Sequence, residues 1–263
     1  MEDYIDKGWR DILAHNGLTD FEAFWTLTDD WFEPPNKRRG GWSGVSRCEL
    51  DLPNGGKTGI FLKRQENHCA RSLRHPLYGI STFLREYEHI MRYRALSVPT
   101  LEVVYFAQRG QGQQQRAILV TAELTGFISL ADQEQQWLRN GLPSRTEKRR
   151  IIEATASLLH SLHKHRIRHG CFFPKHVFIK VNPGGAVEAR VIDLEKAHWH
   201  ISRERCAARD LYSLAHYALP GIWTLTDRLY FLKSYLGLSR LNSQARRLWR
   251  NVVARSVQRR GPQ

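Results

Sequence analysis

The residues with the greatest capacity for chemistry lie in two short stretches of the second half of the chain. A polar loop from His169 to His176 has a histidine at each end, and Asp193 ends a hydrophobic run further on. A catalytic loop, a hairpin and an acidic metal ligand in this order are typical of a site that holds phosphate and metal for phosphoryl transfer. The first hypothesis for this chain is therefore a site of that kind.

The elements around these residues can be predicted from the pattern. Two β-rich runs, Val177 to Val181 and Ala189 to Ile192, flank a turn of Asn, Pro and two Gly, which predicts a hairpin. Apolar residues at helical spacing predict a helix from Glu147 to Lys164 that leads into the loop. We expect Asp210, beyond the hairpin, to cap a helix and to brace the loop by accepting its backbone N–H groups.

The first half of the chain carries a glycine-rich, basic turn that could contact phosphate. Gly40, Gly41 and Gly44 precede or begin an alternating segment. Glycines lack a Cβ, so backbone N–H groups beside them can approach phosphate oxygens. An ordinary hairpin turn has the same composition, and the pattern leaves both interpretations open.

A strand that carries one lysine follows a second glycine turn. Lys63 on this strand matches the lysine that contacts nucleotide phosphates in kinases, which requires a carboxylate partner on the next helix. Glu86 is the first choice for that partner and Glu88 the second. The alternative is that each of these side chains is simply solvated.

Two further strands are predicted, from Val98 to Phe106 and from Arg116 to Leu124, joined by a polar turn over residues 110–115. Their order suggests that the backbone at Glu123 and Leu124 pairs with an adenine edge and that the lobe boundary lies there. Three parts follow from this: a helical extension over residues 1–30, a nucleotide-binding lobe over 31–124 and a catalytic lobe over 125–263.

Composition narrows the class of protein. A chain of 263 residues with 41% hydrophobic residues and eight tryptophans can form a packed core. No apolar run is long enough to span a bilayer, and the acidic N-terminus lacks an apolar signal segment, so we expect a cytoplasmic protein. The four cysteines are far apart, which favours free thiols in a reducing compartment.

The formal net charge of +14 indicates a polyanionic partner. Nucleic acid, an anionic membrane and a phosphorylated glycolipid all satisfy that condition, and charge does not choose among them. The segment from Ser239 to Arg260 predicts an amphipathic basic helix. Such a helix suits an anionic surface, although a solvated face is an equal alternative.

Taken in order, these motifs resemble the lipopolysaccharide kinase family, within the protein-kinase-like superfamily. The likeness covers Trp31 to Tyr217 and is greatest to InaA-type members, which are similar to the WaaP heptose kinases. The motifs that carry it are Gly-Gly-Trp-Ser at 40–43, Phe-Leu-Lys at 61–63, Arg-Glu at 85–86, Val-Pro-Thr at 98–100, His-Gly-x-x-x-Pro-Lys-His at 169–176 and Ile-Asp-Leu-Glu at 192–195.

The resemblance implies an α+β, bilobal, protein-kinase-like fold with a small β-rich N-lobe and a larger, mainly helical C-lobe. It also implies ATP and Mg²⁺ as cofactors, and phosphorylation of a sugar of the lipopolysaccharide inner core, or of another anionic glycolipid, with peripheral contact to the inner membrane. The implied cofactor-binding residues are Gly40, Gly41, Gly44, Lys63, Glu86, Glu123 and Leu124. The implied catalytic residues are His169, Cys171, His176 and Asp193, of which His176 and Asp193 are metal ligands.

Cys171 departs from the family pattern, because the catalytic aspartate should stand there. Cysteine replaces a carboxylate base poorly unless its pKa is lowered. Positioning and charge neutralisation supply most of the acceleration in phosphoryl transfer, so a weakened kinase is one outcome. A kinase-like pseudoenzyme that binds nucleotide and acts as a regulatory module is the alternative. A nucleic-acid-binding protein is a third hypothesis that rests on charge alone, because no nucleic-acid motif accompanies the arginines.

Overall fold

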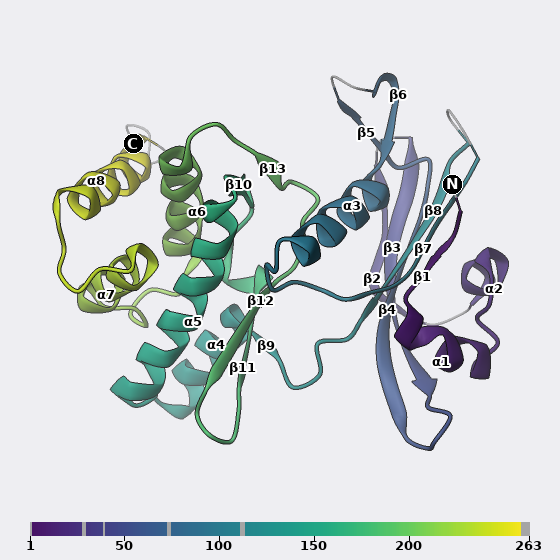
Figure 1. Ribbon diagram of the computed structural model, residues 1–263, viewed down its shortest axis with the longest axis horizontal. Coiled ribbons are helices and arrows are strands. Elements are labelled where there is room, and N and C mark those ends of the chain that lie inside the picture. Colours follow the sequence, from purple (N-terminus) through teal and green to yellow (C-terminus); the bar gives the residue numbers. More distant parts are fainter. Residues whose placement is uncertain (1, 28–29, 39, 73–74, 111–113, 259–263) are drawn as a thin grey trace. The chain divides into compact units, whose positions relative to one another are not determined.

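The structure is a computed structural model that describes residues 2–27, 30–38, 40–72, 75–110 and 114–258. The chain divides into two compact units. Unit 1 comprises Met1–Arg92 and Leu101–Thr125, and unit 2 comprises Tyr93–Thr100 and Gly126–Gln263. Unit 1 is built on an antiparallel sheet with one long helix, and unit 2 is mainly helical, as Figure 1 shows. The predicted α+β, kinase-like class is confirmed.

Unit 1 is organised around a six-stranded antiparallel sheet in the order β1-β7-β8-β4-β3-β2. Two glycine-containing turns keep β2, β3 and β4 adjacent, and β4 lies inside the sheet between β3 and β8. The strands are β1 (Tyr4–Ile5), β2 (Trp31–Arg38), β3 (Gly41–Asp51), β4 (Lys57–Glu66), β7 (Val103–Arg109) and β8 (Arg116–Ala122).

The N-terminal segment packs onto this sheet instead of standing apart from it. It forms a 3₁₀ turn (Lys7–Trp9), α1 (Arg10–His15) and α2 (Phe21–Thr26), and its aromatic side chains enter the core of the sheet. The helical structure predicted for residues 1–30 is therefore confirmed in α1 and α2. The edge strand β1 was not predicted, because two residues that pair with Tyr105 and Phe106 leave no periodic pattern.

A two-stranded ribbon, β5 (Cys69–Ser72) and β6 (His75–Ser81), leads into α3 (Thr82–Ala95). One face of α3 is apolar and buried, with Ile90 and Tyr93 among its residues. The ring of Tyr87 stacks on Phe106 of β7 with centroids 4.2 Å apart. This packing fixes the rotation of α3 about its axis and therefore decides which of its carboxylates face inward.

The described residues of unit 2 form five α-helices, most of which have polar caps at their N-termini. Ser129, Ser144, Ser202 and Thr224 each accept a backbone N–H at the start of a helix, as such residues commonly do. The helices are α4 (Leu130–Asn140), α5 (Arg145–Lys164), α6 (Arg203–Tyr217), α7 (Leu225–Leu236) and α8 (Ser243–Gln258).

Short strands connect these helices and carry the loops. Residues 167–199 form most of two small sheets. One is a three-stranded sheet in the order β12-β11-β9, and the other is a two-stranded ladder of β10 and β13. The bounds are β9 (Ile128–Ser129), β10 (Ile167–Arg168), a 3₁₀ turn (Pro174–His176), β11 (Val177–Val181), β12 (Val187–Val191) and β13 (His198–Trp199). The predicted hairpin after the loop and the predicted helix before it are both confirmed.

One of the two predictions below needs correction. The strand expected from Val98 begins only at Val103. Residues 98–100 belong to unit 2, where Pro99 accepts the N–H of Val191 and the Thr100 hydroxyl donates to the Val191 carbonyl. The basic C-terminal segment forms the predicted helix, α8. Its Ala245 and Leu248 are buried and the helix contacts α6, whereas Val253 is 43% exposed. Internal packing therefore explains part of its apolar stripe.

Three further observations concern sequence expectations. Residues 111–113 of the predicted polar turn, and Arg259 and Arg260, lie outside the described residues. The four cysteines are all free thiols. Among the residues that the structure describes, no helix has both the length and the apolarity that crossing a bilayer requires.

Candidate functional site

Lys63 and Glu86 form a close ion pair in unit 1. Lys63 lies in the interior strand β4, opposite Val45 of β3 and Leu119 of β8. Its Nζ is 2.6 Å from Oε1 of Glu86, whose side chain is buried on the inner face of α3. Glu88 is exposed, because the helical turn places it on the opposite side of α3. The structure thus pairs the lysine with the first-choice glutamate.

The strand that carries Lys63 also holds the start of the helix that carries Glu86. Oε1 of Gln65 accepts hydrogen bonds from the Thr82 hydroxyl at 2.7 Å and from the Phe83 N–H at 3.0 Å. The free N–H groups at a helix N-terminus require such partners. Gln65 therefore fixes α3 on β4, and the ion pair forms between two elements that are already joined.

Glycine is required at the three positions of the basic turn for different structural reasons. Gly40 has a φ of +81°, which a residue with a side chain adopts reluctantly. A Cβ on Gly41 would lie 2.0 Å from the carbonyl oxygen of Glu66, and one on Gly44 would lie 2.4 Å from the ring of Trp31. Packing alone accounts for Gly41 and Gly44, so phosphate contact stays a prediction for all three.

Glu123 and Leu124 directly follow β8, the last strand of unit 1. The carboxylate of Glu123 binds Arg47 through two hydrogen bonds of 2.8 and 2.9 Å. Its N–H donates to the carbonyl of Gly59 at 2.9 Å, and its carbonyl accepts the N–H of Thr125 at 2.9 Å. Glu123 is thus engaged within unit 1, and the predicted adenine contact depends mainly on Leu124.

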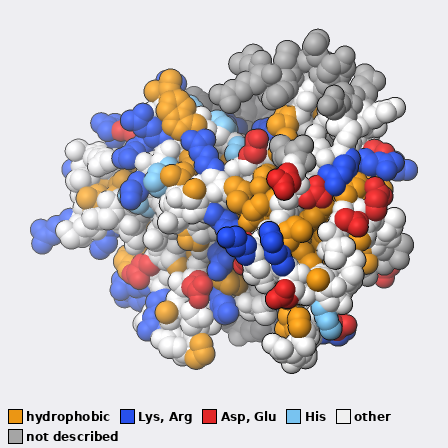
Figure 2. Space-filling model, turned by 45° about the vertical axis from the view of Figure 1, so that its right-hand side comes forward, with side chains coloured by type: hydrophobic (Ala, Val, Ile, Leu, Met, Phe, Trp, Pro, Cys, Tyr) orange, Lys and Arg blue, Asp and Glu red, His pale blue; other side chains and the backbone are white. Residues whose placement is uncertain are grey.

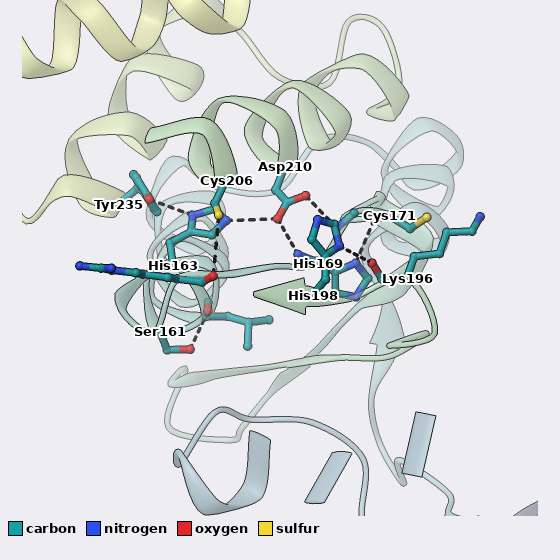
Figure 3. A network of polar contacts seen from close by, with 12 residues as sticks. Ser161, His163, His169, Cys171, Lys196, His198, Cys206, Asp210 and Tyr235 are labelled. Atoms are coloured by element: carbon teal, nitrogen blue, oxygen red, sulfur yellow. Dashed lines mark hydrogen bonds and ion pairs between the residues drawn. The ribbon is translucent and has the colours of Figure 1, made fainter. Parts of the chain in front are cut away.

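In unit 2, Asp210 holds the loop that begins at His169. Its carboxylate accepts the N–H of His169 at 2.8 Å and the N–H of Gly170 at 3.0 Å, so the predicted bracing role is observed. The predicted capping role is wrong, because Asp210 lies inside α6, whose N-cap is Ser202. Nε2 of His163 lies 3.1 Å from the same carboxylate, and Nδ1 of His163 lies 2.8 Å from the hydroxyl of Tyr235. Figure 3 shows Asp210 between the histidine of α5 and the loop backbone.

Burial and hydrogen bonding act in opposite directions on Asp210. Burial alone would raise the pKa of this fully buried carboxyl, but the hydrogen bond from His163, the nearby imidazoles and the His169 N–H lower it further than burial raises it. The net pKa lies below the ordinary value, so the group is a carboxylate at neutral pH. A charged acceptor makes stronger hydrogen bonds to the loop than a neutral one would.

His169 is a neutral imidazole whose tautomer is set by its partners. Nε2 lies 2.9 Å from the carbonyl of Ile192, which can only accept, so Nε2 carries the proton. Nδ1 accepts the N–H of Cys171 at 3.2 Å. Burial lowers the pKa of His169, which agrees with this assignment. His169 therefore ties the loop to the residue immediately before Asp193, and its ring has no remaining lone pair for a metal ion.

His176 and Asp193 place two hydrogen-bond acceptors opposite each other. Nδ1 of His176 donates to the carbonyl of Cys171 at 2.8 Å, which leaves the lone pair of Nε2 directed at Oδ2 of Asp193, 3.4 Å away. Burial lowers the pKa of His176, so the ring is neutral at pH 7. Two facing acceptors require a donor or a cation between them. Asp193 has a φ of +60°, a conformation that Asp and Asn tolerate better than most residues.

These two side chains fit a magnesium site in part. Mg²⁺ is bound through one or two carboxylates plus substrate phosphates, and Asp193, with 38% of its side chain exposed, can serve as that carboxylate. Imidazole suits softer metals better, so His176 fits a hydrogen-bonding role at least as well as direct ligation. Within the described ranges, no cluster of three or more His, Cys, Asp or Glu side chains could hold a metal ion without a substrate.

Cys171 does not have the properties of a base. Its side chain is buried, and burial raises the pKa of the thiol. Lys196, which hydrogen-bonds to it, acts in the opposite direction but does not outweigh burial. The thiol is therefore protonated at neutral pH and cannot accept the proton of a hydroxyl group as a carboxylate would.

Several residues of the site were not found from the sequence. Gln65 and Tyr235 carry no signal, since a polar residue in a strand or helix is ordinary. The sequence did contain a signal for His163, because this residue follows Leu159 and Leu162 on the apolar face of a predicted helix.

An aromatic pair was also missed. Phe173 of the loop contacts Tyr217 at the end of α6, with ring centroids 4.4 Å apart and half of Tyr217 exposed. The two residues are distant in the sequence, so only the fold brings them together.

Comparison with known proteins gives consistent matches along most of the chain. The profile of the Lipopolysaccharide kinase (Kdo/WaaP) family matches residues 22–235. Protein InaA of Escherichia coli K12 is 32% identical over 202 residues, which cover 76% of this chain and 89% of that protein. Lipopolysaccharide core heptose(I) kinase WaaP of Pseudomonas aeruginosa is 30% identical over 229 residues, which cover 84% and 81%.

A solved structure described as WaaP in complex with acyl carrier protein resembles the present fold. Its TM-score is 0.69 at 24% identity, and the match covers 98% of both chains. At that identity the likeness shows the fold.

Proposed function

Because the chain belongs to the lipopolysaccharide kinase (Kdo/WaaP) family, we propose that it is an ATP-dependent phosphotransferase acting on a sugar hydroxyl of the lipopolysaccharide inner core. The single observation that carries the proposal is the ion pair of Lys63 and Glu86, whose atoms are 2.6 Å apart. A lysine held by a buried glutamate on the next helix is the arrangement that kinases use for nucleotide phosphates. A lysine without that role would be expected to extend into solvent.

Unit 1 supplies the groups that bind the nucleotide. The ammonium of Lys63 neutralises phosphate oxygens, and Glu86 holds it in one orientation. The backbone at Gly40 and Gly41 offers N–H groups to the phosphates, and Leu124 contributes the adenine contact. The cost of ordering the lysine side chain is already met in the free protein, because the ion pair fixes it.

Unit 2 supplies the groups that act at the transferred phosphoryl group. Mg²⁺, when bound, neutralises charge on the phosphate oxygens during transfer. Asp193 would be its oxygen ligand, beside His176, whose Nδ1–H is fixed on the loop backbone. Asp210 and His169 keep the loop in one conformation, so that these groups need no rearrangement during the reaction.

The aromatic pair of Phe173 and Tyr217 supports a sugar as the acceptor. Sugar rings present apolar C–H faces that pack well on aromatic side chains, and Tyr217 offers such a face beside the loop. The strongly basic chain agrees with a phosphorylated, anionic acceptor. ATP is a cytoplasmic cofactor, so we place the reaction at the cytoplasmic face of the inner membrane.

The neutral thiol of Cys171 supports a second candidate, a pseudoenzyme that binds nucleotide without transferring phosphate. A general base contributes typically about 10²–10⁴-fold, so its loss leaves either a slow kinase or an inactive one. Positioning and charge neutralisation do not depend on position 171, which favours the slow kinase. The two candidates make the same prediction for nucleotide binding and differ in turnover.

Nucleotide binding is tested by thermal unfolding with and without ATP and Mg²⁺. Nucleotide at a hundredfold excess over its Kd contributes about 2.7 kcal/mol, enough to raise Tm by several degrees. Lys63→Ala and Asp193→Asn should lose this shift, whereas Glu88→Gln, an exposed position on α3, should keep it. An unchanged shift in Lys63→Ala would refute the proposed role of the ion pair.

Turnover is tested by release of ADP with purified lipopolysaccharide core as the acceptor. The kinase should release ADP slowly, and Asp193→Asn should not. Cys171→Asp should raise the rate by about 10²-fold or more if a base is the missing part. ATP binding without ADP release from either the native protein or Cys171→Asp would establish the pseudoenzyme instead. Tyr217→Ala should raise KM for the acceptor and leave KM for ATP unchanged.

A further inference from the structure

Two large apolar side chains are exposed close to the catalytic loop. Trp199 is 49% exposed and Ile201 is 76% exposed. Exposed apolar residues scattered singly need no explanation, but a tryptophan and an isoleucine two positions apart on one protruding segment are different. Neither residue belongs to the core of unit 2, and neither has a role in the proposed reaction.

Cations surround this pair in the sequence and in space. Five exposed Lys and Arg side chains lie in residues 164–168 and 196–205, and Glu204 is the one carboxylate of those two stretches. Glu204 is itself paired with Arg247 of α8. Lys and Arg side chains are also spread widely over the face drawn in Figure 2, interrupted by hydrophobic groups. The five are Lys164, Arg166, Lys196, Arg203 and Arg205.

The two stretches are fastened together, so the surface is preformed. Trp199 pairs with Ile167 in the ladder of β13 and β10. The N–H of His200 donates to the carbonyl of Arg166 at 2.9 Å, and the guanidinium of Arg203 donates to the carbonyl of Lys164 at 2.8 Å. These bonds hold the backbone on both sides of Trp199 and Ile201, and they place the cations of one stretch beside those of the other.

We propose that this surface, which we call the β13 surface and define as Lys164, Arg166, Trp199, Ile201, Arg203 and Arg205, docks the protein on an anionic phospholipid bilayer. Tryptophan is enriched where a bilayer meets water, since its ring is apolar and its N–H polar. Clustered Lys and Arg side chains are attracted by anionic headgroups. An exposed Trp and Ile flanked by exposed cations combine an apolar group for the bilayer interface with positive charge for its anionic headgroups.

The position of the surface connects it to the reaction. Residue 168 of β10 directly precedes His169, and β13 follows Asp193 by only a few residues. One ladder therefore both presents Trp199 and anchors the catalytic loop. This part of the inference rests on the proposed function: a membrane-embedded acceptor would be met by the end of unit 2 that carries the loop.

Two other sites for membrane docking are less suitable. On α8, Leu248 is buried and the exposed Val253 (43%) is aliphatic, so this helix presents no tryptophan as exposed as Trp199. A second group of exposed apolar residues, Leu138 and Leu142, lies around the N-terminal end of α5, at the opposite end of that helix from the loop, as Figure 1 shows for the elements. It contains no aromatic side chain, and it provides a matched control.

The test is sedimentation of the full chain with two kinds of vesicle, one of phosphatidylcholine alone and one of phosphatidylcholine and phosphatidylglycerol in equal amounts. The native protein should bind the anionic vesicles and not the neutral ones. Trp199→Ser/Ile201→Ser should bind at least tenfold more weakly. Leu138→Ser/Leu142→Ser removes exposed apolar surface of the same kind elsewhere and should bind like the native protein.

A charge variant tests the same surface without touching its apolar residues. Each cation near an anionic membrane contributes about fivefold to binding, so Lys164→Gln/Arg205→Gln should bind about 25-fold more weakly. All four substituted side chains in the two β13-surface variants are exposed, and circular dichroism verifies that each variant folds. Equal vesicle binding by native and β13-surface variants, or loss of binding in the leucine control instead, would overturn the proposal.

Two further arms separate this proposal from its alternatives. Salt-dependent retention on duplex DNA, with no binding to vesicles, would overturn membrane docking in favour of a nucleic-acid partner. The ATP-induced thermal shift is measured on the same variants and should be unchanged in Trp199→Ser/Ile201→Ser. Lys63→Ala should show the opposite behaviour, losing the shift and keeping vesicle binding, so that failure of either proposal is recognised separately.

Discussion

Replacing Asp210 by Asn tests whether a single carboxylate fixes the catalytic loop. Asp210 is completely buried and accepts two loop N–H groups at 2.8 and 3.0 Å, with His163 at 3.1 Å on the same group. Asn has nearly the same shape but only one acceptor oxygen. Its NH₂ group must face a donor, either a loop N–H or the imidazole of His163, in a place from which water is excluded.

The expected loss of stability follows from these contacts. Hydrogen bonds to a charged group contribute about 1.5–3 kcal/mol each, so the two loop bonds together contribute about 3–6 kcal/mol. The amide oxygen of Asn keeps one of them as a neutral bond, which contributes about 0.5–1.5 kcal/mol. The net loss for Asp210→Asn is therefore about 1.5–5.5 kcal/mol, a large part of the stability of an ordinary domain.

Urea unfolding followed by tryptophan fluorescence measures this loss as a shift of the midpoint at constant slope. Glu88→Gln is the control, because Glu88 is an exposed carboxylate of α3. Its loss should stay within about 0.5 kcal/mol. A loss for Asp210→Asn below about 1 kcal/mol would refute the reasoning, since the loop would then be held by something other than these two bonds.

Three further predictions concern other parts of the chain. Glu86→Gln should lower the free energy of unfolding by about 1–3 kcal/mol, because a partly buried ammonium loses its charged acceptor, whereas Glu88→Gln should change it by less than about 0.5 kcal/mol in the same urea titration. Thr224→Ala should cost about 1 kcal/mol in thermal unfolding, since it removes the side-chain half of the capping box of α7. Burial lowers the pKa of His169 and of His176 below their ordinary 6.5, so their stabilising contribution is complete above pH 6.5 and is lost as the pH falls through the lowered values. The urea midpoint should therefore fall on acidification below pH 6.5, and a midpoint that rises there would contradict the neutral imidazoles of the site.

Much of the fold could be predicted because local pattern and tertiary role agree. The helix that ends at Lys164 and the hairpin after His176 have strong periodicity, and the structure contains both. The pairing of Lys63 with Glu86 could be predicted from order alone, since a strand and the following helix are neighbours in space. Asp210 is predicted as a brace because it is expected to cap a helix; the brace is observed, but Asp210 lies inside α6.

Other features could not be predicted, for physical reasons that differ. The run that starts at Val98 is buried as expected, but its backbone bonds to Val191 instead of joining the large sheet. The hydrophobicity of a segment indicates that its side chains are buried, but it does not indicate which strand or loop its backbone will hydrogen-bond to. The links through Gln65 and Tyr235 depend on side-chain directions across elements, which one-dimensional periodicity does not contain. The β13 surface could not be predicted, because two exposed apolar residues, Trp199 and Ile201, produce no periodic pattern in the sequence.

The left-handed backbone at Asp193 limits which residues can replace it. A β-branched or bulky residue at a φ of +60° would strain the chain, whereas Asn adopts that conformation about as readily as Asp. Loss of the carboxylate through Asn is thus the substitution that the backbone resists least. Within a lineage, this position is where an active protein and a silent copy of identical shape can diverge by a single codon change.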